Sequence, residues 1–415
     1  MKLVDYSKMT IDEILDSSFQ MTDGGRIDQV KDLYTTFNHD VDLEALKKGG
    51  YINLIGKMME PVLGKPDKSE IPDPYGPEVM AWWAKRGIVK ELHGTDKPMD
   101  WAAFEKKTGY HMEEGQFVIQ QNKHKLWVSF VPASAFGPDG KDKKLPVVFV
   151  LHGAGNNISL LDGWGYVEEA TRRGWIAIVP SLELADVLEE ILEEAKTLYP
   201  VDESRVYACG FSFGGMSSNR LGNERPDLFA AVGPCGAAID NSFSEGRTGR
   251  GEPMPPFDGN PRGLQLGIKM PVINVYGSLD GNRFPFYDFQ PGDRPMFRLK
   301  GPKDLVDATN SWCRVNDVPE IDYDAVMALK GRDDISIEEK HIGIPLLPEN
   351  RSTVTIGGVQ HNIADLRSRD GIVRTKLVCM WGLPHWPSPE MVRQIMDFFS
   401  HFSRDPITKA SVYHP

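Results

Sequence analysis

The sequence lacks the features that mark several large classes of protein. No stretch of its 415 residues reaches the roughly 18 consecutive apolar residues that a membrane-spanning helix needs. The opening MKLVDYSKMTIDEIL has no apolar run of the length found in signal peptides. The net charge is −12 and no basic patch interrupts it, which disfavours nucleic acid or an anionic membrane as a partner. We therefore expect a cytoplasmic protein with neither kind of partner.

Cysteine is scarce as well. The chain has four, at Cys209, Cys235, Cys313 and Cys379. No two of them show the close spacing of a zinc site or a disulfide framework. Each lies within an apolar or helical pattern, so buried free thiols are expected. No metal site is predicted.

Residues 1–112 are predicted to be a helical extension without catalytic chemistry. Thr10 and Glu13 form a capping box ahead of Ile14. Apolar residues recur at helical spacing in 27–37, 51–63 and 77–92. We expect this extension to serve as a lid, a packing layer or an interface, which makes a homodimer a candidate assembly.

From residue 116 the pattern changes to alternating strands and helices. Residues 116–121 and 125–131 are predicted to pair as a hairpin. Five short apolar runs then indicate buried parallel strands, at 146–151, 175–179, 206–209, 272–276 and 376–380. Helices are expected between and after them, at 165–173, 186–199, 213–223, 302–316 and 388–402, and the acidic stretch 183–194 is interpreted as a solvated helix face. Such alternation predicts an α/β fold with a mostly parallel central sheet flanked by helices.

The segment RVYACGFSFGG contains the pattern Gly-x-Ser-x-Gly at the end of a predicted strand and the start of a predicted helix. In this context the serine, Ser212, stands on a tight turn at the carboxyl edge of the sheet. Gly210 and Gly214 are expected to be small because strand and helix backbones pass close to the turn. The motif alone is weak, but its strand-to-helix context makes Ser212 the predicted nucleophile.

A serine hydroxyl needs a base within hydrogen-bond reach, and the base needs an acid that orients it. In this type of fold the chain order is serine, acid, histidine. The strand VINVY runs into GSLDG, which makes Asp280 the predicted acid. Asp288, in the aromatic loop FPFYDF, is the alternative.

Of the ten histidines, His385 is the predicted base. It follows the last predicted strand and precedes the last helix, in the loop WGLPHWPSPE, whose prolines restrict the backbone. His341 and His361 lie before the last strand and are less suitably placed. His152, in LHGAGNN, is expected to orient the loop rather than to act as a base.

An oxyanion intermediate needs two preorganised hydrogen-bond donors. The backbone N–H of Phe213, next to the nucleophile, is predicted to be one. The small residues of LHGAGNN let the backbone approach a substrate, so the N–H of Ala154 is predicted to be the other.

These pieces carry a family resemblance. Residues from about 116 to 403 resemble the polyhydroxybutyrate-depolymerase and feruloyl-esterase-like branch of the α/β-hydrolases, through LHGAGNN, VDESRVYACGFSFGGMSSNRLGNERPDLFAAVGPCGAA, PVINVYGSLDG and GLPHWPSPE. The resemblance implies a serine esterase that uses no metal or organic cofactor, and it assigns the same triad of Ser212, Asp280 and His385.

Two segments depart from the family pattern. Residues 1–112 precede the predicted catalytic domain of residues 113–405, and roughly residues 325–365 form an insertion before the last strand. Residues 406–415 are expected to be a C-terminal tail. Both departures are places where the substrate pocket could differ from that of the family.

A small or oligomeric ester is the predicted substrate. Aromatic residues are expected around the site, and they suit an apolar or aromatic acyl group or a sugar face. The predicted rim consists of Trp164, Phe211, Phe213, Phe284, Phe286, Tyr287 and Trp386, although several of these could instead pack loops together. A peptidase or amidase with the same triad is the first alternative. A non-catalytic binding protein is disfavoured because the triad residues and glycines are all present.

Overall fold

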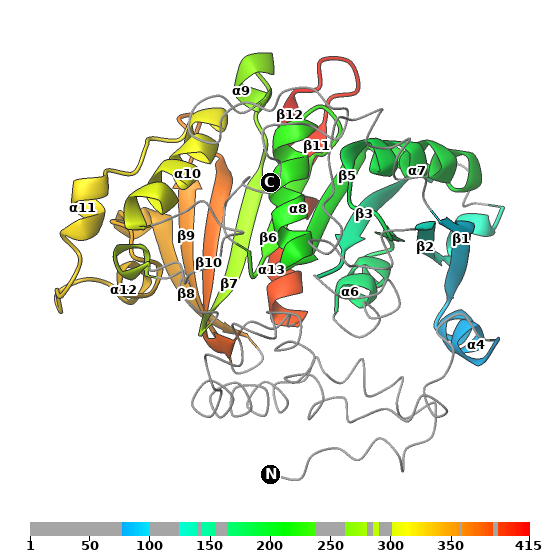
Figure 1. The fold of residues 1–415 in the computed structure, drawn as a ribbon, viewed down its shortest axis with the longest axis horizontal. Helices are drawn as coiled ribbons and strands as arrows, with labels where there is room; N and C mark the ends of the chain where they lie inside the picture. Colours follow the sequence, from blue (N-terminus) through cyan, green and yellow to red (C-terminus); the bar gives the residue numbers. More distant parts are fainter. Residues whose placement is uncertain are drawn as a thin grey trace, which may run out of the picture.

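The computed structural model describes residues 77–98, 124–138, 143–153, 165–237, 262–279, 285–289, 301–356, 359–384 and 389–415. They form a ten-stranded sheet with helices on both faces, together with a small two-stranded sheet (Figure 1). The predicted helices before residue 77 and the predicted strand at 116–121 lie outside the described residues.

The large sheet has the order β1-β2-β4-β3-β5-β6-β7-β10-β9-β8. Its strands are β1 (Ile88–Pro98), β2 (His124–Pro132), β3 (Leu145–Leu151), β4 (Ile176–Pro180), β5 (Val201–Phe211), β6 (Ala231–Cys235), β7 (Val272–Leu279), β8 (Arg351–Ile356), β9 (Val359–Arg367) and β10 (Val373–Pro384). The six central strands from β4 to β10 run parallel, and the two at each edge are antiparallel to their inner neighbours. The predicted α/β class and mostly parallel sheet are confirmed.

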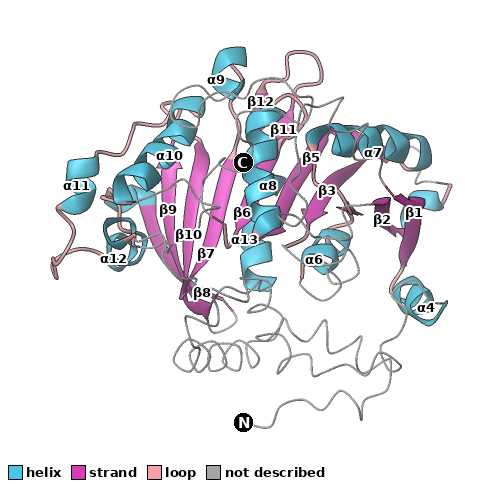
Figure 2. Cartoon of the chain, in the orientation of Figure 1, coloured by secondary structure: helices cyan, strands magenta, loops and turns pink. Residues whose placement is uncertain are grey.

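Helices connect the strands and cover both faces of the sheet (Figure 2). They are α4 (Pro77–Lys85), α6 (Tyr166–Arg172), α7 (Ala185–Leu198), α8 (Phe213–Glu224), α9 (Arg262–Leu266), α10 (Pro302–Val315), α11 (Tyr323–Met327), α12 (Ile337–Ile342) and α13 (Pro389–Ser400), with single 3₁₀ turns η3 (Ala133–Phe136), η6 (Phe286–Asp288) and η7 (Pro348–Asn350). Among the described helices none combines the length and the apolar character that crossing a membrane requires.

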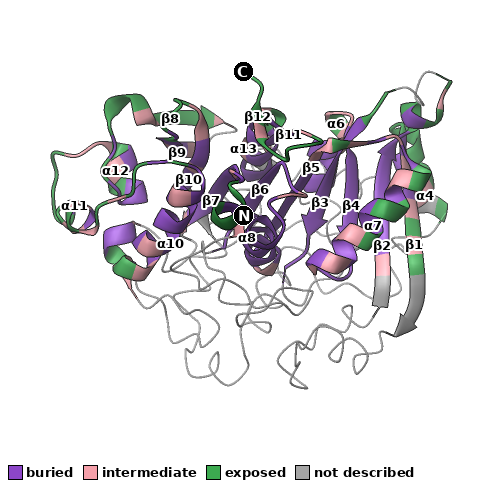
Figure 3. Ribbon diagram, turned by 90° about the horizontal axis from the view of Figure 1, so that it is seen from above, coloured by how far each residue is buried: buried purple, intermediate pink, exposed green. Residues whose placement is uncertain are grey.

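The core has two layers, one on each face of the sheet. Every residue of β3 is buried, and its side chains alternate between the layers: Phe149 faces one and Val150 the other. The first layer is packed beneath α7, α8 and α10, and the second beneath α6 and α13 (Figure 3). A strand covered on both faces needs apolar residues at every position, which explains the continuous run LPVVFVL.

The start of the sheet differs from the prediction. The helix expected over residues 77–92 ends at Lys85, and after a turn at Gly87, whose φ is +74°, the chain enters β1 at Ile88. β2 pairs antiparallel with β1 on one side and with β4 on the other, so its partners in the described residues do not come from 116–121. The sheet therefore begins before residue 113, where the catalytic domain was expected to start.

The insertion before the last strand extends the sheet. It comprises α11, α12, β8 and β9, and β9 pairs antiparallel with β10. At the other end of the chain, β11 (Phe402–Arg404) and β12 (Ser411–Tyr413) form a hairpin, so the expected tail is ordered against its neighbours. Arg404 fastens this hairpin through hydrogen bonds to the carbonyls of Phe229 and Lys269.

Candidate active site

Ser212 lies in the one-residue turn between β5 and α8. Its backbone has φ 56° and ψ −111°, a left-handed conformation that residues with a side chain rarely adopt. Its amide donates to the carbonyl of Cys235 on β6 at 2.9 Å, and its carbonyl accepts from the amide of Met216 at 3.0 Å. Backbone strain of this kind persists only where neighbours enforce it, and it concentrates at functional sites. The strand–serine–helix arrangement expected from the sequence is present.

Close backbone contacts explain the glycines around the turn. A Cβ atom on Gly210 would lie 2.4 Å from the carbonyl oxygen of Leu151, and one on Gly214 would lie 2.2 Å from the same oxygen. Gly215 is similarly restricted, with the carbonyl oxygen of Cys235 at 2.7 Å from such an atom. The backbone at the end of β3 therefore packs directly against the turn. Gly210 and Gly214 have to be small for this reason, as the sequence predicts.

The carboxyl ends of the parallel strands meet at one edge of the sheet. Leu151 of β3 and Gly210 of β5 are in register, as are Phe211 of β5 and Cys235 of β6. Farther along, Leu279, the last residue of β7, pairs with Pro384, the last residue of β10. Ser212 follows β5 directly at this same edge.

Several predicted site residues lie outside the described residues. They are Ala154, Trp164, Asp280, Phe284, His385 and Trp386. Asp280 is the residue after the end of β7, and His385 is the residue after the end of β10. Their roles stay predictions, as do those of Ala154 and the three aromatic residues.

The described aromatic residues differ in exposure. Phe213 is the first residue of α8 and is half-buried. Phe211 is 5% exposed and belongs to the core layer beneath α6 and α13. Phe286 and Tyr287 are buried in the other layer, and the Tyr287 hydroxyl donates to the carbonyl of Lys340. Loop packing, one of the two interpretations of the aromatic rim, therefore accounts for Phe286 and Tyr287.

The alternative acid and base residues have other partners. Asp288 is exposed and forms an ion pair with Lys330 at 2.7 Å. The His341 ring stacks on Trp381, with ring centroids 3.7 Å apart, and burial lowers its pKa. His361 is fully buried on β9, accepts from Gln394, and burial lowers its pKa to about 4.

A buried polar group beside the turn was not foreseen from the sequence. Glu183 was expected on a solvated helix face, but it is 5% exposed and precedes α7, in the segment that follows β4. Its carboxylate lies 3.8 Å from Nδ1 of His152, which is fully buried at the end of β3. Burial raises the pKa of Glu183, and this effect exceeds the opposing influence of His152, Ser217 and Arg220. The usable signal was its position just after a strand end, which marks the catalytic edge in this fold class.

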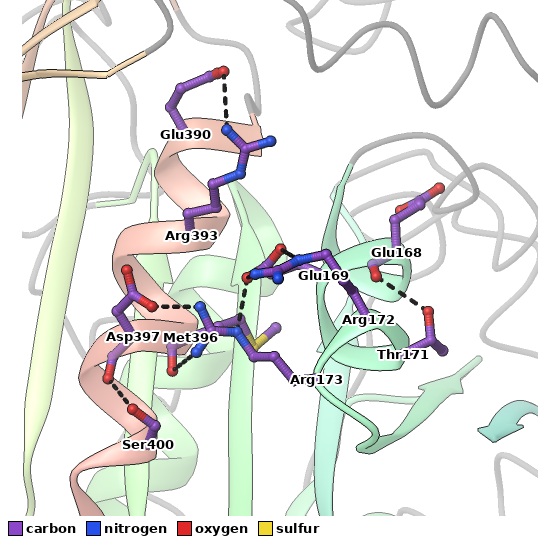
Figure 4. A network of polar contacts seen from close by, with 10 residues as sticks. All are labelled: Glu168, Glu169, Thr171, Arg172, Arg173, Glu390, Arg393, Met396, Asp397 and Ser400. Atoms are coloured by element: carbon purple, nitrogen blue, oxygen red, sulfur yellow. Dashed lines mark hydrogen bonds and ion pairs between the residues drawn. The ribbon is translucent and has the colours of Figure 1, made fainter. Parts of the chain in front are cut away.

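An ionic network connects the two helices of the second layer (Figure 4). Arg173, which caps α6, donates to Glu169 at 2.7 Å and also reaches Asp397 and the carbonyl of Met396 on α13. Burial alone would raise the pKa of Glu169, but hydrogen bonds from Arg172 and Arg173 lower it below the ordinary value. Because α6 follows the loop after β3 and α13 follows the loop after β10, the network holds together the helices behind both loops.

Within the described part of the chain, no three histidine, cysteine, aspartate or glutamate residues are grouped so that they could hold a metal ion. The four cysteines are buried and none of them forms a disulfide, as predicted.

The fold and the turn at Ser212 together define the class. A mostly parallel sheet, helices on both faces and a serine on a strained strand-to-helix turn are the features of the α/β-hydrolase fold. No family model matches the sequence.

Comparison with known proteins shows similarity to serine esterases of this fold, including a feruloyl esterase. The chain is 26% identical over 213 residues to the putative esterase NocK of Nocardia uniformis subsp. tsuyamanensis, a match that spans 46% of this chain and 56% of that protein. It is 28% identical over 205 residues to feruloyl esterase B of Thermothelomyces thermophilus, over 43% of this chain and 68% of that protein. Among solved structures, an acetyl xylan esterase from Aspergillus awamori matches 66% of the chain and 93% of its own length with a TM-score of 0.39 and 14% identity.

Proposed function

We propose that this protein is a serine hydrolase that cleaves carboxylic esters, with Ser212 as nucleophile, His385 as general base and Asp280 as the acid that orients it. The observation that carries the proposal is the strained backbone of Ser212 between β5 and α8, at the carboxyl edge of the sheet. The similarity to two esterases supports the reaction class.

The order of the strands supports the choice of acid and base. Asp280 and His385 each follow the last residue of a strand, and those last residues, Leu279 and Pro384, are paired neighbours. Each of the two proposed residues is therefore one Cα–Cα step, about 3.8 Å, from a member of that pair. The ion pair of Asp288 with Lys330 also favours Asp280 as the acid, because the carboxylate of Asp288 already has a partner.

In the proposed reaction His385 takes the proton from the Ser212 hydroxyl while Oγ attacks the ester carbonyl. The backbone amides of Phe213 and Ala154 donate hydrogen bonds to the oxyanion that forms. Protonated His385 then gives its proton to the leaving alcohol, which leaves an acyl group on Ser212. Water, activated by His385, releases the acid and restores the serine.

For the substrate we propose an ester with an aromatic or other apolar acyl group. Trp164, Phe284 and Trp386 are the proposed contacts, and the name of one relative, feruloyl esterase, fits an aromatic acid. A peptidase or amidase with the same triad is the second candidate, since acyl-enzyme chemistry also serves amides.

The first test maps the nucleophile. A fluorophosphonate probe should label Ser212, and Ser212→Ala should abolish both the label and the turnover of p-nitrophenyl acetate. Ser204→Ala is the matched control, because Ser204 lies near the start of β5, at the opposite end of the strand from Ser212, where its hydroxyl donates to Asp202. Full activity in Ser212→Ala would refute the proposal.

The second test separates the two aspartates and the two substrate classes. Asp280→Asn should lower kcat by about 10⁴-fold, as loss of the orienting acid does in a triad, whereas Asp288→Asn should leave kcat unchanged. Aryl and alkyl esters of increasing acyl length, assayed beside peptide anilides, would distinguish an esterase from a peptidase. Light scattering on the purified protein would test the proposed homodimer, and cell fractionation the proposed cytoplasmic location.

A further inference from the structure

The imidazole of His152 is hydrogen-bonded to the backbone carbonyl of the next residue, Gly153. Its Nδ1 lies 3.1 Å from the carbonyl oxygen of Gly153, and its Nε2 lies 3.4 Å from that of Ser181. Carbonyl oxygens only accept, so each of these contacts needs a proton on the ring nitrogen that makes it, and the shorter one places a proton on Nδ1. The ring is fully buried, which prevents water from taking over these contacts.

Glu183 is placed to keep that proton on Nδ1. One carboxylate oxygen lies 3.8 Å from Nδ1, and the side chain is 3% exposed. Ser217 and the backbone of His152 also lie close enough to the carboxylate to lower its pKa, although burial outweighs them. A buried carboxylate of this kind favours a nearby N–H, because its own interaction with solvent is lost. The backbone of Glu183 is held in turn by Arg220 of α8, which donates to its carbonyl.

The Gly153 carbonyl belongs to the peptide group that joins residues 153 and 154. A trans peptide group is planar, so a contact that fixes its carbonyl also fixes the direction of its N–H. That N–H is the proposed second oxyanion donor. The same part of β3 supports the nucleophile turn, since the carbonyl oxygen of His152 would lie 2.8 Å from a Cβ on Gly214.

We infer that Glu183 and His152 are positioning residues for the oxyanion hole: Glu183 fixes the Nδ1–H form of His152, and His152 fixes the peptide group that presents the donor. The inference rests on the proposed function of Ser212. Neither residue touches the substrate, so their contribution appears in the transition state, where the oxyanion forms, rather than in substrate binding.

The test compares kcat and KM for p-nitrophenyl acetate in full-length variants. His152→Leu removes both ring nitrogens, and kcat should fall by about 100-fold, the scale of losing one oxyanion donor, with KM within about twofold. His152→Asn keeps an N–H at the same distance along the side chain as Nδ1, and it should retain kcat within about tenfold of the wild type.

Glu183 is tested through its dependence on His152. Glu183→Gln should lower kcat by about tenfold in the wild-type background and cause no further fall in His152→Leu, because Glu183 acts only through the imidazole. The matched control is His361→Asn, which replaces another fully buried histidine, on β9, and should leave kcat within about twofold.

Wild-type kcat in His152→Leu would overturn the inference, and so would an equal effect of Glu183→Gln in both backgrounds. If His152→Leu does not fold, wild-type kcat in Glu183→Gln would overturn it instead. A loss in His361→Asn as large as in the His152 variants would also do so, because any buried histidine would then matter. Phosphonate labelling separates the two proposals: labelling of a residue other than Ser212 refutes the nucleophile, whereas slow labelling at Ser212 in the His152 variants supports the positioning role.

Discussion

The nucleophile turn and the edge lobe, which we define as α12, β8 and β9, are held together in different ways. At the turn, backbone meets backbone: Gly210 and Gly214 leave no room for a Cβ against Leu151. In the edge lobe, β8 and β9 pair through their backbones, but side chains connect α12 to these strands. Nδ1 of His341 lies 2.5 Å from Oδ1 of Asn362, whose amide donates to Thr353.

The two regions should therefore differ in how well they tolerate substitutions. Backbone atoms cannot move aside without shifting a strand, whereas a side-chain network can lose one contact and keep the others. We therefore expect substitutions at the turn to affect activity and stability together, and substitutions in the edge lobe to affect stability alone.

The largest effect is expected for Gly214→Ala. The added methyl group would lie 2.2 Å from the carbonyl oxygen of Leu151, so β3 or α8 must shift. The free energy of unfolding should fall by about 3 kcal/mol, the upper part of the range for overpacking, and esterase activity should be nearly lost. Urea denaturation and p-nitrophenyl acetate turnover measure the two effects.

Gly301→Ala is the control for this change. Gly301 has an extended backbone, and no atom lies within 4 Å of the place where its added methyl group would stand, so activity should not change. Because Gly301 is the N-cap of α10, the free energy of unfolding should fall by about 1 kcal/mol or less. Normal activity in Gly214→Ala would show that the turn has more freedom than these contacts allow.

The second effect concerns pH and the edge lobe. The folded-state pKa of His361 is about 4, below its ordinary value of 6.5, because burial disfavours the charged ring. The neutral form is thus favoured by folding, so its contribution is fully present above pH 6.5 and is lost as the pH falls toward 4. The loss should approach about 3 kcal/mol, since each pKa unit corresponds to 1.36 kcal/mol.

Chemical denaturation at several pH values would measure this loss. His361→Asn does not titrate, so its free energy of unfolding should change less over the same interval. An equally steep dependence in the variant would assign the acid sensitivity to other groups.

A smaller effect is expected for Asn362→Ala. The change removes the buried partner of His341 and a part-buried hydrogen bond to the exposed Thr353, and it should cost about 2 kcal/mol in the free energy of unfolding. Turnover should stay within about twofold of the wild type. A large loss of kcat would remove the distinction between the two regions.

The smallest effect is expected for Arg351→Gln. Its ion pair with Glu339, at 2.8 Å, is partly exposed, and Glu339 also accepts from the amides of Ser336 and Leu346. The free energy of unfolding should change by less than about 1 kcal/mol. A larger cost, measured by thermal or urea denaturation, would mean that the lobe depends on single contacts.

The central fold could be predicted because its signals are local. Strands buried on both faces, such as β3, need continuous apolar runs, and the helix expected at 302–316 is found as α10 (Pro302–Val315). The turn at Ser212 was predictable for the same reason, since its glycines and serine are adjacent in the sequence.

Features set by tertiary contacts were harder to predict. β6, with the sequence AVGPC, is short and contains both glycine and proline, yet it is buried between β5 and β7. The first part of β1, up to Leu92, was predicted as the end of a helix over 77–92, and its pairing with β2 makes it a strand. Glu183 belongs to an acidic stretch whose later members Glu190, Glu193 and Glu194 are exposed, and only its position just after β4 sets it apart. Its burial depends on His152 and Arg220, which come from other elements.

The pairing of Leu279 with Pro384 also has a consequence for when the proposed triad could be complete during synthesis. These residues are 105 positions apart, so their contact closes a long loop and is among the slower kinds of contact to form. The serine turn, in contrast, joins a strand and helix that are adjacent in the chain. A growing chain would therefore form the turn with the proposed nucleophile well before the proposed base was in place. It would have no esterase activity until β10 had paired with β7.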